Sequence, residues 1–360
     1  MASAPTLAPL SAVEAVSPAF ERAKRQLFQP FRYSHWWRLA LTALLAGEMG
    51  SGGNFNWNSG NWNIPARKGK DFFLLAPPPW ADWHDYLPLI VAGVLFGMVL
   101  MVIFIYVSSV FRFILFDSVL TERVHIREGW GRWQERGGQF FLWQIGFSAV
   151  TITLAGLLVG LPLLYAWRHG LFRNADEHWG ALLLGGTLMV FLGIALFFSA
   201  AVVGLFTKDF VVPLMALEEL SAMDAWRRLL PLLKSEKGSY AGYVGMKIVL
   251  AIASGIIFGI LSLFVLLIVL IPLVILGILV AAVVVAMGLT WNPLTIILAV
   301  LVGAVLLFGL FWLMTLVSVP AVVFFQFYTL HFFGSRYPRL AAMLTPSAPP
   351  PPPEAVPAPA

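Results

Sequence analysis

The chain alternates long apolar blocks with polar stretches that carry most of its charges. About 20 consecutive apolar residues make a helix that crosses a bilayer, and every one of five blocks exceeds that length. The pattern therefore predicts an all-α fold, a polytopic transmembrane helix bundle with about six or seven spans. The blocks cover residues 86–111, 140–167, 180–206, 240–287 and 293–333.

Three segments leave the number of spans open. Residues 36–46 are apolar but short for a span, so they cross only with flanking residues or where the bilayer thins. The block at 240–287 is too long for one tilted helix, and we expect a turn between two spans at Pro272. The last block also exceeds one bilayer thickness, so its C-terminal half is expected at the interface. The side of the membrane on which the chain ends stays open.

Composition narrows the class of protein. Apolar residues make up 59% of the 360 residues and charged residues 11%, at a mean hydropathy of +0.84, which excludes a soluble or a disordered protein. Cysteine is absent, so thiolate chemistry and Cys-ligated metals are excluded. The predicted division is a flexible N-terminus without a signal peptide, a transmembrane domain, an extracytoplasmic Gly/Asn/Trp-rich loop within it, and a disordered Pro-rich tail. In the same order, these four parts cover residues 1–16, 17–340, 47–85 and 341–360.

The basic residues are unevenly distributed along the chain. Lys and Arg number five in each of residues 1–38, 112–138 and 207–239, against three in 47–85 and two in 168–179. Cytoplasmic segments of membrane proteins carry the excess of Lys and Arg. The three richer segments, and with them the N-terminus, are therefore predicted to be cytoplasmic.

Two of these basic segments match each other without a gap when the chain is shifted so that Arg112 falls on Lys208. Both leave an apolar block and end in an acidic-x-Trp-x-Arg helix, which predicts an internal repeat of an amphipathic cytoplasmic helix plus two spans. A Trp at headgroup depth with an Arg that reaches phosphate is typical of lipid contact, although such a helix can also only anchor its spans. The candidate headgroup residues are Arg22, Arg112, Trp130, Arg132, Lys208, Trp226 and Arg228.

Two stretches resemble a known group of proteins. They are SPAFERAKRQLFQPF at 17–31, followed by WWRL at 36–39, and SVPAVVFFQFYTL at 318–330. Both resemble uncharacterised bacterial membrane proteins related to the membrane domain of glycerophosphodiester phosphodiesterases. The resemblance implies a multi-pass protein of the bacterial cytoplasmic (inner) membrane. It implies no activity, because the phosphodiester chemistry of that family belongs to a separate soluble barrel for which this chain has no room.

Charge inside the apolar blocks is limited to Lys247, which we expect to snorkel to the interface. That speaks against an ion-coupled transporter, which keeps ionisable groups at membrane depth. Glycines within the blocks, such as Gly156 and Gly160, suit close helix packing. Histidines and carboxylates flank two blocks on the predicted outer face and form either a candidate divalent-metal site or a plain polar rim. The candidate ligands are His84, Asp85, His169, Asp176 and His178.

These patterns predict a non-enzymatic membrane protein with a lipid-interacting or envelope-assembly role, since no ATPase, zincin or serine-hydrolase motif occurs. Two alternatives stay open: a passive transporter or channel for a lipid or small amphiphile, and an outer-face metal-dependent enzyme. No cofactor is expected. The expected partners are membrane lipids, anionic ones among them, and a second copy or another membrane protein. Nucleic acid is not expected, because lipid headgroups account for the basic segments.

Overall fold

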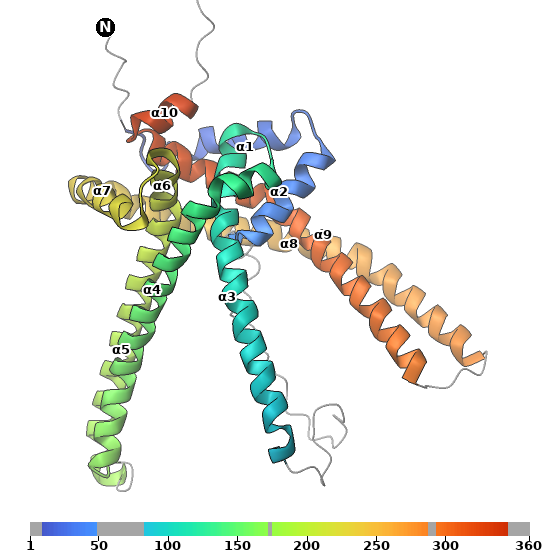
Figure 1. Cartoon of the computed structure of the whole chain (residues 1–360), viewed down its shortest axis with the longest axis horizontal. Helices are drawn as coiled ribbons and strands as arrows, with labels where there is room; N and C mark the ends of the chain where they lie inside the picture. Colours follow the sequence, from blue (N-terminus) through green and yellow to red (C-terminus); the bar gives the residue numbers. More distant parts are fainter. Residues whose placement is uncertain (1–8, 49–82, 172–174, 287–292, 345–360) are drawn as a thin grey trace, which may run out of the picture.

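The computed structural model describes residues 9–48, 83–171, 175–286 and 293–344, which fold into helices joined by short connections (Figure 1). The all-α class predicted from the apolar pattern is confirmed. The described helices are α1 (Val16–Phe28), α2 (Tyr33–Leu45), α3 (Trp83–Thr121), α4 (Ile126–Arg168), α5 (Ala175–Phe206), the π-helix η2 (Thr207–Val211), α6 (Val212–Glu218), α7 (Ala222–Ser235), α8 (Lys237–Ala286), α9 (Pro293–Gly334) and α10 (Pro338–Leu344).

The helices form a head from which three limbs diverge (Figure 1). The limbs are the first part of α3, the α4–α5 pair and the α8–α9 pair, and the two helices of each pair contact each other. The head holds the shorter helices and the adjoining ends of the long ones. Large buried side chains such as Phe113, Phe210 and Phe327 lie there, whereas the most apolar stretch of every limb helix is exposed. The limbs therefore need apolar surroundings.

Five of the described helices are long and apolar enough to cross a membrane, which makes this a multi-pass membrane protein. They are α3, α4, the continuous α5–η2–α6 rod, α8 and α9. Each exceeds the about 20 residues that cross hydrocarbon, so its surplus length reaches into the head. The C-terminal half of α9 accordingly packs in the head against α1, α2 and α10.

Two segments that left the span number open are resolved by the structure. Helix α2 packs against α3 and α9 in the head and is not among the five long apolar helices. The predicted turn at Pro272 is wrong, because α8 continues through this residue to Ala286. Proline removes one helical hydrogen bond, whereas a turn exposed to lipid would leave several backbone groups unsatisfied at several kcal/mol each. An unbroken helix is the less costly solution.

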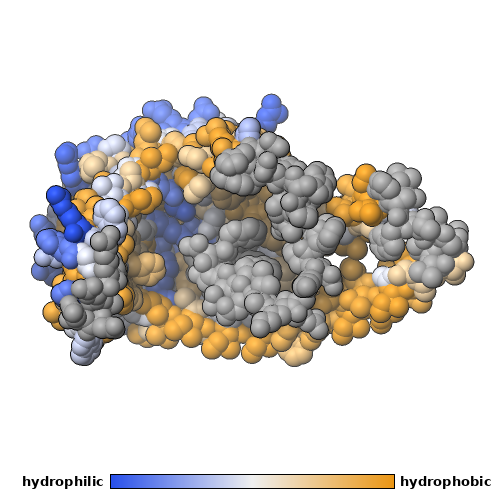
Figure 2. All heavy atoms as spheres, turned by 90° about the horizontal axis from the view of Figure 1, so that it is seen from below, coloured by the Kyte–Doolittle hydropathy of each residue, from blue (hydrophilic) through white to orange (hydrophobic). Residues whose placement is uncertain are grey.

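The described parts of the three segments richest in Lys and Arg all lie in the head, while the end of α4 and the start of α5 lie at the far end of their limb (Figure 1). In Figure 2, seen from below, orange, apolar residues cover the right side and the lower edge of the view, and blue, hydrophilic residues gather at the left and along the upper left edge. The basic segments therefore lie together in the head, and their cytoplasmic side stays a prediction. The predicted flexible N-terminus, the 47–85 loop and the Pro-rich tail fall largely outside the described residues.

Candidate functional site

Five charged side chains meet where the limbs leave the head, and we call this cluster the charged centre. Its members come from four parts of the fold: the residue group after α2, then α3, η2 and α8. Each side chain is at most 19% exposed. Ionisable groups within membrane-spanning helices are rare, and each is a candidate for a functional role. The charged centre consists of Glu48, Arg112, Lys208, Asp209 and Lys247.

In one half of the charged centre, two cations converge on one carboxylate. The Nζ atom of Lys208 forms an ion pair with Glu48 Oε2, and Arg112 Nε lies 3.6 Å from Glu48 Oε1. Arg112 also donates from Nη2 to the main-chain oxygen of Ala46 at 3.3 Å and lies 5.3 Å above the ring centroid of Phe140. The α2 end, α3 and η2 are thus tied together through Glu48.

In the other half, Asp209 accepts from two residues of α8. Lys247 Nζ forms an ion pair with Asp209 Oδ2, and the hydroxyl of Tyr243 donates to the same oxygen at 2.9 Å. The Tyr243 hydroxyl also lies 2.7 Å from Thr329 Oγ1 in α9. The ring of Tyr243 stacks on Tyr328, with centroids 5.2 Å apart. This half therefore links the α4–α5 limb to the α8–α9 limb.

The π-helix explains how neighbouring residues serve both halves. Lys208 and Asp209 are consecutive in η2, and consecutive helical side chains point in clearly different directions. One reaches Glu48 and the other Lys247 and Tyr243. Short π-helical segments occur frequently at functional sites. The whole centre holds three cations and two carboxylates, so it carries a surplus of one positive charge.

Sequence reasoning missed most of this site. Lys247 was expected only to snorkel to the interface, and the pairing of its ammonium group with Asp209, which is 5% exposed, was not predicted. The sequence signal for this pair was Lys247, a single cation inside an apolar block, because a buried ion needs a partner of opposite charge. The carboxylate three residues beyond the preceding apolar block, at Asp209, was the nearest source in the sequence. Nothing in the sequence pointed to Glu48, Tyr243 or Thr329.

The seven predicted headgroup residues fall into two groups. Four are engaged by carboxylates, two of them in the charged centre. The other two are Arg22, whose Nε lies 3.6 Å from Glu122 Oε1, and Arg228, whose Nη2 lies 3.6 Å from Glu218 Oε1. These charges stabilise contacts between head elements.

The remaining three lie on the outer rim of the head. Trp130 packs against Phe111, with ring centroids 5.8 Å apart, and Trp226 stacks on Trp143 at 6.4 Å. Arg132 is exposed, with its guanidinium 4.9 Å above the centroid of a neighbouring tryptophan ring. The rings of the two tryptophans thus pack against other aromatic side chains of the protein, whereas Arg132 stays accessible.

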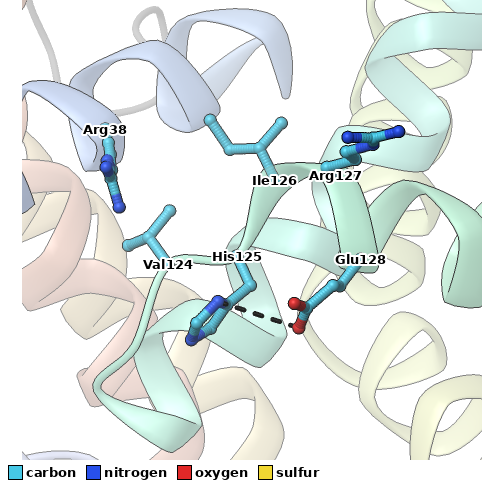
Figure 3. A pocket seen from close by; sticks show the side chains of 6 residues that line it. All are labelled: Arg38, Val124, His125, Ile126, Arg127 and Glu128. Atoms are coloured by element: carbon cyan, nitrogen blue, oxygen red, sulfur yellow. Dashed lines mark ion pairs between the residues drawn. The ribbon is translucent and has the colours of Figure 1, made fainter.

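A small polar hollow of about 210 Å³ adjoins this rim (Figure 3). Arg38 reaches it from α2, and His125, Arg127 and Glu128 line it at the start of α4. The Nδ1 atom of His125 lies 3.7 Å from Glu128 Oε2, and the two side chains are 59% and 83% exposed. Such open, hydrated groups lack the enclosure of a catalytic site.

Outside the limbs, Tyr337 and His35 are among the titratable groups of the head with shifted pKa values. Tyr337 donates a hydrogen bond to Glu218, and burial followed by this bond raises the pKa of Tyr337 to about 12. On α2, burial lowers the pKa of His35 below its usual 6.5, and the positive charge of Arg32 lowers it further. Both side chains therefore favour their neutral forms in the folded protein.

The candidate metal ligands lie at the tips of two different limbs (Figure 1). His84 and Asp85 begin α3, whereas His169 follows α4 and Asp176 and His178 begin α5. His169 packs its ring against Tyr165, with centroids 4.4 Å apart. Among the side chains that the structure describes, no group of three or more potential ligands comes together. The side chains of His84, Asp85 and Asp176 are outside that set, so the metal site stays a prediction.

A family model relates the chain to known proteins. No curated protein and no solved structure matches it. The model of one family of unknown function matches residues 10–343, which include all the described helices except the last residue of α10, and the whole charged centre. This match covers almost the entire chain, so the protein belongs to the family of unknown function DUF7544.

Proposed function

We propose that this protein is a non-enzymatic integral membrane protein that binds anionic membrane lipids and serves a lipid-interacting or envelope-assembly role. The observation that carries the proposal is the charged centre, with its surplus of one positive charge at the junction of three apolar limbs. A basic residue near a membrane surface attracts anionic lipid by about 1 kcal/mol. An anionic headgroup therefore complements this junction.

The depth of the charged centre supports a headgroup rather than a hydrocarbon environment. The span in α3 begins at Leu87, and Arg112 follows it by more than the about 20 residues that cross the hydrocarbon core. The limbs, whose apolar windows are exposed, extend away from the head on one side (Figure 1). The geometry thus favours contact of the centre with the polar edge of the bilayer.

Several finer statements form part of the same proposal. We place the protein in a bacterial cytoplasmic membrane with the head and the N-terminus in the cytoplasm, and relate its bundle to the membrane domain of glycerophosphodiester phosphodiesterases. The proposed internal repeat is supported by Arg112 and Lys208, which it aligns and which both reach Glu48. The residues with positive φ after α3 and α6, Glu122 and Glu219, are offset by one position in this alignment, which pairs Glu122 with Glu218.

Native mass spectrometry tests the lipid preference directly. Delipidated full-length protein is mixed with equal amounts of phosphatidylglycerol and phosphatidylethanolamine, which differ in net charge. We expect retained adducts of phosphatidylglycerol to outnumber those of phosphatidylethanolamine. Equal retention of the two lipids would overturn the proposal.

Flotation on anionic liposomes tests the arginines of the two Trp-bearing helices separately. The double variant Arg132→Ala with Arg228→Ala should bind more weakly than the unchanged protein, because both side chains lie on exposed faces of Trp-bearing helices. The matched control, Lys234→Ala with Lys237→Ala, removes the same charge from another part of the head. Equal losses in both variants would show that net charge, and not these two arginines, decides binding.

A further inference from the structure

We propose that a groove between α1, α8 and α9 binds one acyl chain of an anionic phospholipid, whose headgroup lies at Lys24. The inference deepens the proposed function by naming a binding site and a lipid class. The groove has a volume of about 320 Å³, which falls in the range of about 300–1,000 Å³ common for small-ligand sites. It is separate from the charged centre.

The groove is an apolar channel with a floor of small residues. Ala23 of α1, Ala253 and Ser254 of α8, and Ala321 of α9 line it, and their short side chains leave the space between the three helices open. Larger apolar residues form its edges. Among them, Ile257 on α8 is 62% exposed and belongs to a helix that can cross the membrane. The groove therefore opens toward lipid.

Helix α1 presents an unusual stripe to this groove. Its residues Ala19, Ala23 and Leu27 are buried against the head, and α1 packs along α9. Phe20 and Phe28 line the groove and remain 56% and 51% exposed. Residues spaced by four lie on one helix face, so the stripe continues through position 24, between the two phenylalanines. Phe20 and Phe28 are suited to contact with bulk lipid, whereas Lys24 between them carries a charge.

That charge is the basis for choosing an anionic lipid as the occupant. Lys24 is the one charged residue among those that line the groove. It is exposed, and no ion pair with a described carboxylate engages it, in contrast to Arg22 two positions earlier. A lysine can lay its methylene stem on an apolar surface and extend its ammonium group to a headgroup. A basic amphipathic helix at a bilayer surface favours anionic lipids in this way.

A photo-crosslinking experiment tests the site in the full-length protein. Phosphatidylglycerol with a diazirine on one acyl chain is added at low mole fraction to phosphatidylcholine nanodiscs. After photolysis, we expect adducts on peptides that contain Ala253 and Ala321, and we expect excess unlabelled phosphatidylglycerol, but not phosphatidylcholine, to suppress them. Annular lipid would instead label all limbs alike and would not be displaced.

Two variants and one control separate the chain site from the headgroup site. Ala321→Trp fills the groove and should abolish its adducts, while adducts on the exposed face of α5 around Leu184 persist. Lys24→Gln should lower the preference for phosphatidylglycerol over phosphatidylcholine about fivefold, the equivalent of one basic residue near the surface. Lys234→Gln on α7 is the matched control and should leave the preference unchanged.

The alternative outcomes are distinct. Groove adducts that do not respond to competitor, or that persist in Ala321→Trp, would overturn the proposal. Absence of groove adducts together with a dimer mass in native mass spectrometry would show a second copy in the groove instead of a lipid. If native mass spectrometry still shows preferential retention of phosphatidylglycerol when the groove fails these tests, the lipid-binding function stands and only this site is wrong.

Discussion

The indole Nε1 of Trp36 in α2 donates a hydrogen bond of 3.1 Å to the main-chain oxygen of Leu316 in α9. In a regular helix this oxygen would accept from the N–H group of residue 320, but Pro320 has no N–H group. Trp36 therefore satisfies the carbonyl that the proline leaves open. The bond joins a head helix to a limb helix at the point where α9 enters the head.

The Trp36 bond should contribute measurably to stability. Trp36→Phe keeps an aromatic ring beside Phe28 and Phe31, whose centroids lie 5.4 and 5.3 Å away, and removes the donor. We expect a loss of about 1 kcal/mol in the free energy of unfolding, the usual net contribution of a neutral hydrogen bond. Unfolding in detergent measures it.

The control is the same substitution in a Pro320→Ala background. Alanine restores the helical N–H group, so the Leu316 oxygen regains an acceptor role within α9 and depends less on Trp36. The cost of Trp36→Phe should then fall by more than half. An equal cost in the two backgrounds would show that the tryptophan acts through packing alone.

Breaking the Asp209–Lys247 pair should be strongly destabilising. The two side chains are 5% and 13% exposed, and Asp209→Asn leaves the lysine ammonium without its counter-ion. We expect a loss of about 3–5 kcal/mol, the range for a buried ion pair that loses one partner. Thermal unfolding of the purified protein provides the measurement.

A double variant separates the pair from its surroundings. Asp209→Asn combined with Lys247→Met removes both charges and should cost less than Asp209→Asn alone. The exposed pair of Arg227 with Asp224, 77% and 52% exposed, is the control, and Arg227→Gln should cost less than about 1 kcal/mol. Additive effects of the two buried changes would argue against a coupled pair.

The sequence was sufficient for the limbs because a membrane span is a local property. A run of apolar residues identifies α3, α4, α5, α8 and α9 without any knowledge of their neighbours. Pro272 misled the count, since proline usually ends a helix in water but is tolerated in a span. The basic segments likewise revealed which ends of the helices share the head.

The candidate site was not predictable in the same way because its contacts join distant segments. Glu48 follows the end of α2 and contacts Lys208 only when α2 and η2 are packed together in the fold. Close helix packing shows the same limit. The expected glycines Gly156 and Gly160 have open space around them, whereas Gly137, which no motif marked, lies against Val110 of α3. A local sequence pattern predicts whether a residue faces lipid, water or the protein interior, but not which distant residue it contacts.

Acid should destabilise the head through His35. Its pKa is lowered in the fold by burial and by Arg32 and Arg38, against the opposing charge of Glu122. A base with a lowered pKa in the fold contributes stability above its unfolded pKa of about 6.5, and that stability is lost as pH falls through the folded value. The melting temperature should therefore drop below about pH 6.5, and less so in His35→Gln.

Removing the nearby cation tests the cause of the His35 shift. Arg32→Gln should raise the folded pKa of His35 toward its unfolded value and so flatten the same pH dependence. Nuclear magnetic resonance of the imidazole protons follows the titration directly. A titration of His35 that does not move in Arg32→Gln would show that Arg32 does not contribute to the shift.

The close approach of α3 and α4 depends on Gly137. A Cβ atom at this position would lie 2.8 Å from Val110 Cα and 2.6 Å from its Cγ2, and a backbone atom cannot move aside as a side chain can. Gly137→Ala should therefore separate the two helices in the head and cost about 1–3 kcal/mol, as overpacking does. Gly131→Ala on the same helix meets nothing within 4 Å and should stabilise α4 by up to about 1 kcal/mol, the difference in helix propensity. Opposite signs for the two variants in one unfolding assay are the expected result, and a neutral or stabilising Gly137→Ala would show that the α3–α4 contact is looser than 2.8 Å implies.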